Sequence, residues 1–371
     1  MSHYWVFTNE TTTVDFTDEV QSANVVKGRA TQDDQYSPGG LTFTIRNQSD
    51  QAAGFTLNDQ IKIDTDGFYQ IFWVKEILFD DQPGLGLAST ATIVCNDLLG
   101  MMGRINVIND TLTQRETLDQ IYQEFNSLLP TGSNFNLFGK GDSTAIGDTY
   151  TGSVLNRLNL NLTTEQGWLG LFAANCALIS RSNIQDLLPA TITFRRGTST
   201  GYFVGYSNIE RIQLGTNFVN TSSVFPPVAA AQTEVNAASV ALYGTYGQTL
   251  STVDNSAPQA AGLANWIASS RSDPTILSFV ITFNNLTDHL FRFMESIFFS
   301  LPVVNVEYRV PGDVADTTSL QIVQGLQMQI TNVGTFFTMT TSPYSYYDFT
   351  VIYNSPDFVY DGATNYNGGN W

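Results

Sequence analysis

Apolar and polar residues alternate along about the first 100 residues, a pattern typical of strands with one buried face. Leu41, Phe43 and Ile45 alternate with polar residues, so we expect them to face a core. Pro38-Gly39-Gly40 supplies a turn before this strand, and Asp66-Gly67 suits a tight hairpin turn. Further strands are expected at 61–63, 68–79 and 91–95. Together these features indicate a small barrel or sandwich.

Helical spacing of apolar residues replaces this alternation after residue 97. The segment from Asp110 to Leu129 places Leu118 and Ile121 on one face. Thr113 to Glu116 has the sequence of a capping box and Pro130 ends the segment, so a helix is expected here. Further helices are expected at 164–175, 256–270 and 287–301.

Strand patterns return in the second half of the chain. They are expected at 191–194, 202–204, 209–219, 221–224, 303–310, 320–330 and 336–341. The last stretch, 344–371, is rich in Tyr, Asn, Asp and Gly and has no sustained period. We therefore predict a mainly β fold with α+β insertions, in which residues 99–189 form a separate α+β domain.

The charge of the chain is strongly acidic although charged residues are few. Sixteen Lys and Arg stand against 34 Asp and Glu, which gives a formal net charge of -18 with only 13% of residues charged. Nucleic-acid binding needs clustered Lys and Arg, and the sequence contains no such cluster. The acidity favours either simple solubility or adaptation to a salty environment, or else a wall that nucleic acid passes without sticking.

The two cysteines and the N-terminal residues carry little functional information. Cys95 and Cys176 each lie in an apolar stretch, so we expect two unpaired thiols in the core. Residues 1–5 lack the basic and apolar regions of a secretory signal, and no apolar run approaches about 18 residues. We expect neither secretion by a signal peptide nor a transmembrane helix.

A serine-hydrolase pattern occurs at Gly197-Thr198-Ser199-Thr200-Gly201. A nucleophile elbow needs a strand before it, a helix after it and a later histidine. Here strand patterns lie on both sides, and the only later histidine is His289, at the start of a predicted helix. We interpret the segment as a hairpin turn.

Metal sites have equally weak support. Cys95, Cys176, His3 and His289 show no zinc-ligand spacing. Asp64–Gly67 resembles part of a calcium loop, but the full loop would place Lys62 and Trp73 at ligand positions. A hairpin turn explains this segment better.

Phosphate binding and acid catalysis are also unconvincing. Gly139–Thr144 resembles a phosphate loop without its full spacing. The carboxylate candidates are Asp33-Asp34, Asp80-Asp81 and Glu165 near Trp168, at positions where turns or helix starts explain an acid. We predict no enzyme activity and no catalytic, cofactor-binding or metal-binding residues.

The order of segments resembles the minor tail or tail-tip (baseplate) hub proteins of tailed bacteriophages. Gly28-Arg29, Tyr36–Gly39 and the strand Leu41–Asn47, which ends in Arg46-Asn47, are similar to the N-terminal β-domain of that family. Further similar elements are Ile71–Phe79, Ala91–Leu99, Thr163–Trp168, Arg195-Arg196, Asn217 with Val219, Ala238-Ser239 with Tyr243-Gly244, and Val303–Val310.

The resemblance implies two small β-barrel-like domains, a middle α+β domain and a helix-containing insertion. The expected divisions are 1–98 for the first barrel-like domain, 99–189 for the middle domain, 190–250 with 302–343 for the second barrel-like domain, 251–301 for the helical insertion, and 344–371 for a C-terminal tail. That tail departs from the family's usual ending.

The function that the resemblance implies is structural. Three copies would form a pseudo-six-fold ring that joins the tail tube and distal tail proteins to a spike or fibres, with DNA leaving through the lumen without specific binding. Such a protein is made in the host cytoplasm and resides in the virion. One alternative is a receptor-binding or carbohydrate-binding β-sandwich tail protein; a cell-wall hydrolase is disfavoured by the lack of a histidine-based site.

Overall fold

The computed structural model describes most of the chain. The described residues are 5–30, 34–47, 54–65, 68–80, 89–185, 192–200, 202–213, 218–254, 256–274, 277–284 and 303–347. The expected helix at 287–301 and nearly all of the expected C-terminal tail lie outside them.

The N-terminal β-unit is a sheet with the order β2-β1-β5-β6-β7-β4-β3. Its strands are β1 (Val6–Asn9), β2 (Val14–Asp15), β3 (Val20–Gly28), β4 (Gly40–Arg46), β5 (Gln60–Thr65), β6 (Phe68–Asp80) and β7 (Thr90–Asn96), with a 3-10 turn, η1, at Thr17–Glu19. Leu41, Phe43 and Ile45 are buried on β4 as the alternation predicts. Thr65 pairs with Phe68 in the antiparallel pair of β5 and β6, and the expected turn residues Asp66 and Gly67 lie outside the described residues.

The C-terminal barrel is a closed ring of six strands. Around the ring they run β22 (Thr317–Thr331), β21 (Val303–Tyr308), β15 (Thr193–Arg195), β16 (Phe203–Ile212), β20 (Ser278–Asn284) and β23 (Gly334–Pro343), which pairs with β22 again. Strand β20 was not expected, because its segment was assigned to the helical insertion.

The two β-units are joined by β22, which is long enough to pair with strands of both units. Its first half, Thr317–Ile322, pairs with β21, and Gly325–Thr331 pairs with β3. Buried residues from both units form one continuous core. Gly28 allows the backbones of β3 and β22 to lie close together, because a Cβ at this position would lie 2.2 Å from the Gln324 carbonyl oxygen. Its φ of +83° is also a backbone conformation that favours glycine.

The middle unit, residues 98–185, mixes helices with short strands. Its elements are α1 (Leu98–Met102), β8 (Asn106–Thr111), β9 (Arg115–Glu116), α2 (Thr117–Phe125), η3 (Asn126–Leu128), β10 (Phe135–Phe138), β11 (Thr144–Ala145), β12 (Thr149–Ser153), α3 (Val154–Glu165), β13 (Trp168–Phe172), β14 (Asn175–Ile179) and α4 (Arg181–Gln185). An α+β composition was predicted for this region, and the predominantly β fold with α+β insertions is confirmed.

Two predicted helices in this unit are wrong in detail. Helix α2 begins at Thr117, four residues after the proposed cap at Thr113, because residues 106–111 and 115–116 form strands. The helix predicted at 164–175 is not formed: α3 ends at Glu165, and strands β13 and β14 follow it. Trp168 therefore begins β13 and lies in no helix.

An insertion between β16 and β20 forms its own small unit. It holds β17 (Thr221–Phe225), β18 (Gln232–Val235), α5 (Ala237–Tyr243), β19 (Gly247–Ser251) and α6 (Ala257–Ser270). The three strands form a separate sheet rather than part of the barrel, unlike the expected division at residue 250. Helix α6 is confirmed, and its N-cap Ser256 accepts a hydrogen bond from the Gln259 N–H.

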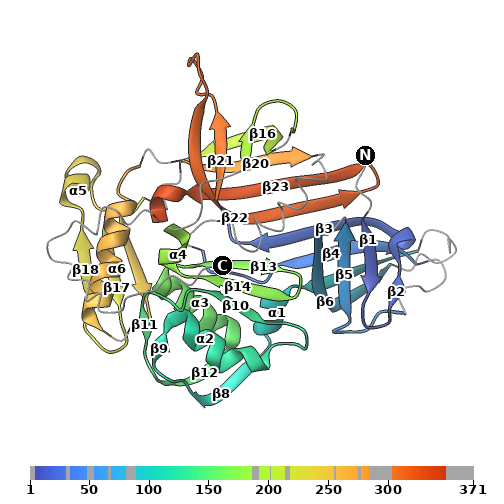
Figure 1. Cartoon of the computed structure of the whole chain (residues 1–371), viewed down its shortest axis with the longest axis horizontal. Helices are drawn as coiled ribbons and strands as arrows, with labels where there is room; N and C mark the ends of the chain where they lie inside the picture. Colours follow the sequence, from blue (N-terminus) through green and yellow to red (C-terminus); the bar gives the residue numbers. More distant parts are fainter. Residues whose placement is uncertain are drawn as a thin grey trace, which may run out of the picture.

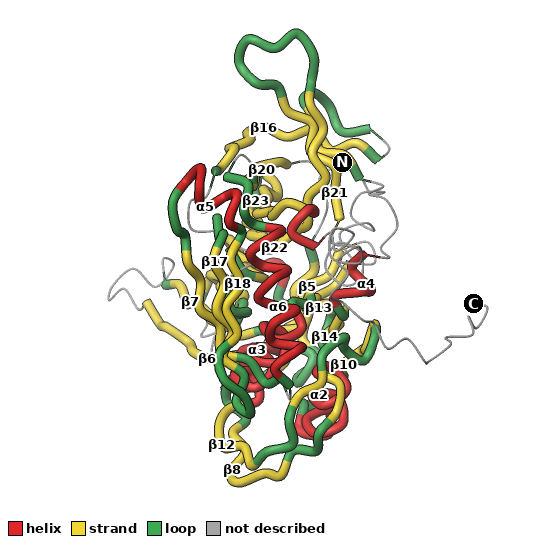
Figure 2. Tube along the Cα trace, turned by 90° about the vertical axis from the view of Figure 1, so that its left-hand side faces the viewer, coloured by secondary structure: helices red, strands yellow, loops and turns green. Residues whose placement is uncertain are grey.

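The units are arranged around the long shared strands. Figure 1 shows the barrel strands above, the N-terminal β-unit to the right, the middle unit below and the insertion at the left end. Figure 2 shows the β21–β22 hairpin projecting from the rest of the molecule. The last described element is a short 3-10 turn, η5 (Tyr344–Tyr347), which packs on the middle unit and β22.

Candidate functional site

Ser199 does not lie at a nucleophile elbow. Strands β15 and β16 are parallel, with Thr193 opposite Phe203, so they do not form a hairpin with each other, although Thr200 and Phe203 exchange two backbone hydrogen bonds in an antiparallel bridge. The loop between them folds back on itself, and the Ser199 hydroxyl accepts a hydrogen bond from the Gly205 N–H at 3.0 Å. This hydroxyl therefore stabilises the connection between two parallel strands. His289 lies outside the described residues.

The Gly139–Thr144 loop binds a carboxylate of the protein itself, that of Glu165. The carboxylate of Glu165, at the end of α3, accepts hydrogen bonds from the Asp142 N–H at 2.8 Å and the Ser143 N–H at 3.1 Å. The Thr117 hydroxyl donates to the same carboxylate at 2.6 Å. The resemblance to a phosphate loop thus reflects convergent backbone N–H groups that are occupied by Glu165.

Burial determines the protonation of Glu165. The side chain is fully buried, which raises its pKa to about 7, and the nearby Asp142 carboxylate adds to the rise. Arg181 and the hydrogen bonds oppose it, and the Arg181 N–H donates to Glu165 at 3.1 Å. A carboxyl enclosed in this way cannot reach a substrate, so its role is to hold α2, α3 and α4 together.

A second buried acid marks the contact between the middle unit and the insertion. Asp254 pairs with Ala145 in an isolated bridge, and burial raises its pKa to about 6. Beside it, the Val253 N–H donates to the Thr164 hydroxyl at 2.9 Å, while the Ile146 N–H donates to the Val253 carbonyl at 2.9 Å. The insertion is therefore joined to the middle unit through backbone hydrogen bonds that run alongside this acid.

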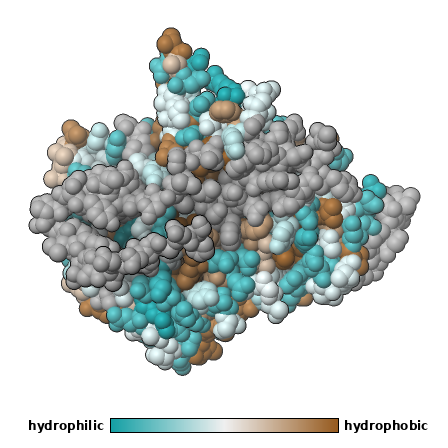
Figure 3. Space-filling model, in the orientation of Figure 1, coloured by the Kyte–Doolittle hydropathy of each residue, from teal (hydrophilic) through white to brown (hydrophobic). Residues whose placement is uncertain are grey.

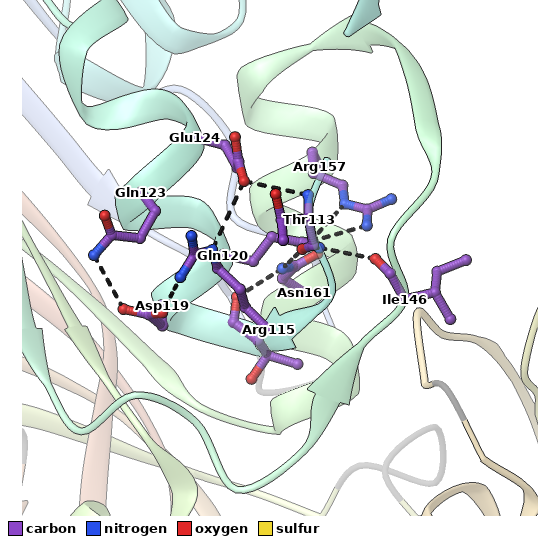
Figure 4. Close-up of polar contacts among 10 residues, drawn as sticks. Thr113, Arg115, Asp119, Gln120, Gln123, Glu124, Ile146, Arg157 and Asn161 are labelled. Atoms are coloured by element: carbon purple, nitrogen blue, oxygen red, sulfur yellow. Dashed lines mark hydrogen bonds and ion pairs between the residues drawn. The ribbon is translucent and has the colours of Figure 1, made fainter. Parts of the chain in front are cut away.

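A polar network joins α2 to α3 within the middle unit (Figure 4). Arg157 is 2% exposed and pairs with Asp148 at 3.0 Å, while its Nη2 donates to Gln120 Oε1 at 2.9 Å. Gln120 donates in turn to the carbonyl oxygens of Thr113 and Ile146. Every one of these contacts is internal, which makes the network a structural joint.

Two of the residues that carried the family resemblance, Arg29 and Tyr36, lie where the three main units meet. Arg29 stacks on the ring of Tyr36 at 4.4 Å, and its Nε donates to Gln324 Oε1 of β22 at 2.8 Å. Tyr36 exchanges two backbone hydrogen bonds with the Asn159 side chain of α3. Its hydroxyl accepts from the Leu169 N–H at 3.0 Å. These motif residues therefore dock the middle unit onto the shared strands.

A buried lysine lies at the same junction. Lys27 is buried, which lowers its pKa to about 8, and its ammonium donates to the Leu171 carbonyl at 3.4 Å. Burial raises the pKa of its neighbour Asp97, which caps α1 by accepting from the Gly100 N–H. A cavity of about 30 Å³ between β3, β13 and β22 adjoins the lysine, large enough for one or two water molecules.

The remaining candidates do not form a reactive site. Cys95 and Cys176 are buried, unpaired thiols, as expected, and burial raises the pKa of each. Within the described residues no group of three His, Cys, Asp or Glu side chains could hold a metal ion. Asp33 and Asp81 lie outside those residues. No helix in the described part of the chain is long and apolar enough to cross a membrane.

Exposed aromatic side chains bear on the carbohydrate-binding alternative. Each of the four described tryptophans is at most 5% exposed. Figure 3 shows apolar side chains scattered among polar ones on the visible face, with an apolar tip on the projecting β21–β22 hairpin, where Val314 is 97% exposed. The described surface therefore offers no tryptophan platform for a sugar ring.

This architecture recurs in solved structures. No protein-family model and no curated protein matches the sequence. The tail protein from Neisseria meningitidis MC58 is similar over 92% of this chain and 97% of its own, with a TM-score of 0.63 and 10% identity. The 43 kDa tail protein of prophage MuSo2 from Shewanella oneidensis is similar over 94% and 98%, with a TM-score of 0.62 and 10% identity.

A third structure extends this group. Prophage tail protein gp18 from Listeria monocytogenes EGD-e is similar over 91% of this chain and 94% of its own, with a TM-score of 0.55 and 10% identity. The chain therefore has the fold of phage tail proteins along almost its whole length. The resemblance predicted from the order of segments is confirmed at the level of the fold.

Proposed function

We propose that this chain is a non-enzymatic structural component of a bacteriophage tail tip. The observation that carries the proposal is a fold shared with tail proteins over more than nine-tenths of the chain. The internal use of its candidate catalytic groups supports the same conclusion, since Ser199 and Glu165 both hold backbone segments in place.

The proposal extends to a ring of three copies. Each chain contributes two β-units that share β22 and one core, so three chains present six units around an axis. Such a ring would adapt a six-fold tail tube and distal tail proteins to a three-fold spike or set of fibres. DNA would leave through its lumen during ejection, past acidic walls that repel phosphate.

Native mass spectrometry of the purified protein tests the ring. We expect a species three times the 40.8 kDa chain mass, or incorporation into tails with three copies per particle. A protein that stays monomeric at micromolar concentration, is absent from assembled tails and binds host glycans would contradict the proposal and support a receptor-binding role.

A further inference from the structure

The insertion between β16 and β20 is attached to the middle unit by hydrogen bonds and has no apolar core in common with it. Its own core, gathered around Leu263, Trp266 and Ile267, contains residues of the insertion alone. None of the apolar clusters formed by the described residues combines side chains of the insertion with those of the middle unit. The strength of this attachment therefore depends on the polar groups at the contact.

Backbone groups form the centre of this contact. The Ile146 N–H donates to the Val253 carbonyl at 2.9 Å, and the Val253 N–H donates to the Thr164 hydroxyl at 2.9 Å. Figure 1 shows β11, which contains Ala145, beside the insertion. Two longer bonds also cross the contact, from the Thr144 N–H to Gln259 Oε1 at 3.4 Å and from Arg271 Nη2 to Gln166 Oε1 at 3.1 Å.

The side chain of Asp254 is enclosed at this contact. Its backbone is bridged to Ala145, and the residue is 1% exposed. Neither of its carboxylate oxygens has a hydrogen-bond partner among the described residues, and the same holds for the Thr252 hydroxyl. A buried carboxylate without hydrogen bonds is costly to ionise, because nothing replaces the water that it loses.

The charged groups around Asp254 leave it without an ion pair among the described residues. Arg181 of α4 is the cation that acts on it, but this guanidinium pairs with Asp142 at 3.7 Å, and the Arg181 N–H donates to Glu165 of α3. Strand β19 and the helical residues of α6, on either side in sequence, carry no charge. Burial raises the pKa of Asp254 to about 6, although Thr252 and Arg181 oppose the rise.

We propose that Asp254 is a pH-sensitive latch, which holds the insertion against the middle unit while its carboxyl is protonated and loosens the contact when the carboxyl ionises. The ionised carboxylate regains hydration when water enters the contact, and water enters when the bonds among Ile146, Val253 and Thr164 open. In the open state the pKa returns toward 3.8. The closed state is therefore favoured most below pH 3.8, and this advantage is lost as pH rises through 6.

The latch operates within one chain, so it does not depend on the ring of three copies. Hydrogen exchange of the full-length protein, resolved to single amides and expressed as protection factors, tests it. The Ile146 and Val253 N–H groups report on the contact. The Val74 N–H, which donates to the Asp59 carbonyl in the N-terminal β-unit, reports on global unfolding. We expect the protection of Ile146 and Val253, relative to Val74, to fall at least tenfold between about pH 4.5 and pH 7.5.

Asp254→Asn keeps the shape of the side chain and removes the titrating proton. In this variant the same fall should shrink to less than about threefold, with Ile146 still protected at the higher pH. Asp254→Ser is a second neutral variant with the same expected outcome. Glu234→Gln is the matched control, because Glu234 is an acid of the insertion on β18, at the opposite edge of its sheet from β19. It should keep the response of the wild type.

Thr164→Val separates the packing of the contact from its titration. It removes the acceptor of the Val253 N–H without changing any charge, so protection should fall at both pH values and the response to pH should remain. Equal responses of Ile146, Val253 and Val74 in the wild type would overturn the proposal. A response that persists in the neutral Asp254 variants, or that Glu234→Gln also abolishes, would overturn it as well.

Discussion

At the scale of single residues, chemical identity did not reveal what a side chain does. Glu165 is a residue type that often acts as a catalytic acid, and the Gly139–Thr144 loop resembles an anion-binding loop. In the structure the loop's N–H groups donate hydrogen bonds to the Glu165 carboxylate, so neither is available to a ligand. Gly28 shows the opposite case. It belongs to a short motif with no evident chemistry, and the structure explains it by the 2.2 Å approach that a Cβ would make to Gln324.

Glu165 should give the protein a measurable pH dependence. Its pKa rises from 4.5 to about 7 on folding, so its contribution to stability is complete below pH 4.5 and is lost as pH rises through 7. The free energy of unfolding should fall by on the order of 2 kcal/mol between pH 5 and pH 8 through this group. Denaturant titrations of the wild type and Glu165→Gln should show a smaller slope with pH in the variant.

A matched control separates this effect from general acid titration. Glu76 is exposed on β6, so Glu76→Gln should keep the wild-type slope. Asp254 titrates in the same direction, with a pKa raised to about 6, and remains in both proteins. Equal slopes in the wild type and Glu165→Gln would show that burial does not control this carboxyl.

At the scale of elements, local patterns located strands better than helices. Alternation identified β4, β5 and β7, because the period of two is a property of adjacent side chains. The helix predicted at 164–175 failed because its apolar residues belong to two buried strands, in which every second residue need not be polar. Short apolar runs of this kind do not distinguish a buried strand from a helix.

The joint between α2 and α3 should depend on Arg157. Arg157→Met removes a buried cation, which takes the guanidinium from Asp148 and leaves Gln120 Oε1 with the Asn161 amide as its remaining donor. We expect a loss of about 3 kcal/mol in the free energy of unfolding, measured by chemical denaturation. Arg115→Met is the control from the same network, since that guanidinium is 38% exposed and should cost less than about 1 kcal/mol. Similar losses for both variants would contradict the role of burial.

At the scale of the whole molecule, β22 decides the architecture. It pairs with β3 of the N-terminal β-unit and with β21 and β23 of the barrel, so the two units cannot separate without exposing a common core. The insertion has its own small core around α6, so its three strands can form a sheet separate from the main one. The described residues thus form one framework around a shared sheet and core, with an appended unit.

The acidity of the molecule predicts how it treats DNA. A net charge of -18 with few basic residues should prevent phosphate binding even when screening is weak. In a mobility-shift assay at low salt, the purified protein should not retard duplex DNA at micromolar concentration, whereas a basic protein of similar size run alongside should. Retardation by this protein would contradict the proposal that DNA passes through a lumen of the assembled ring.

The sequence by itself determined the acidic balance, the mainly β class, the buried faces of several strands, and the order of segments typical of tail proteins. These features depend on composition and on neighbouring residues, so they can be recognised without a fold. Only the tertiary structure decided that β3 pairs with β22, that β15 and β16 are parallel, and that Glu165 is enclosed. Each of these depends on contacts between distant parts of the chain, which no local pattern encodes.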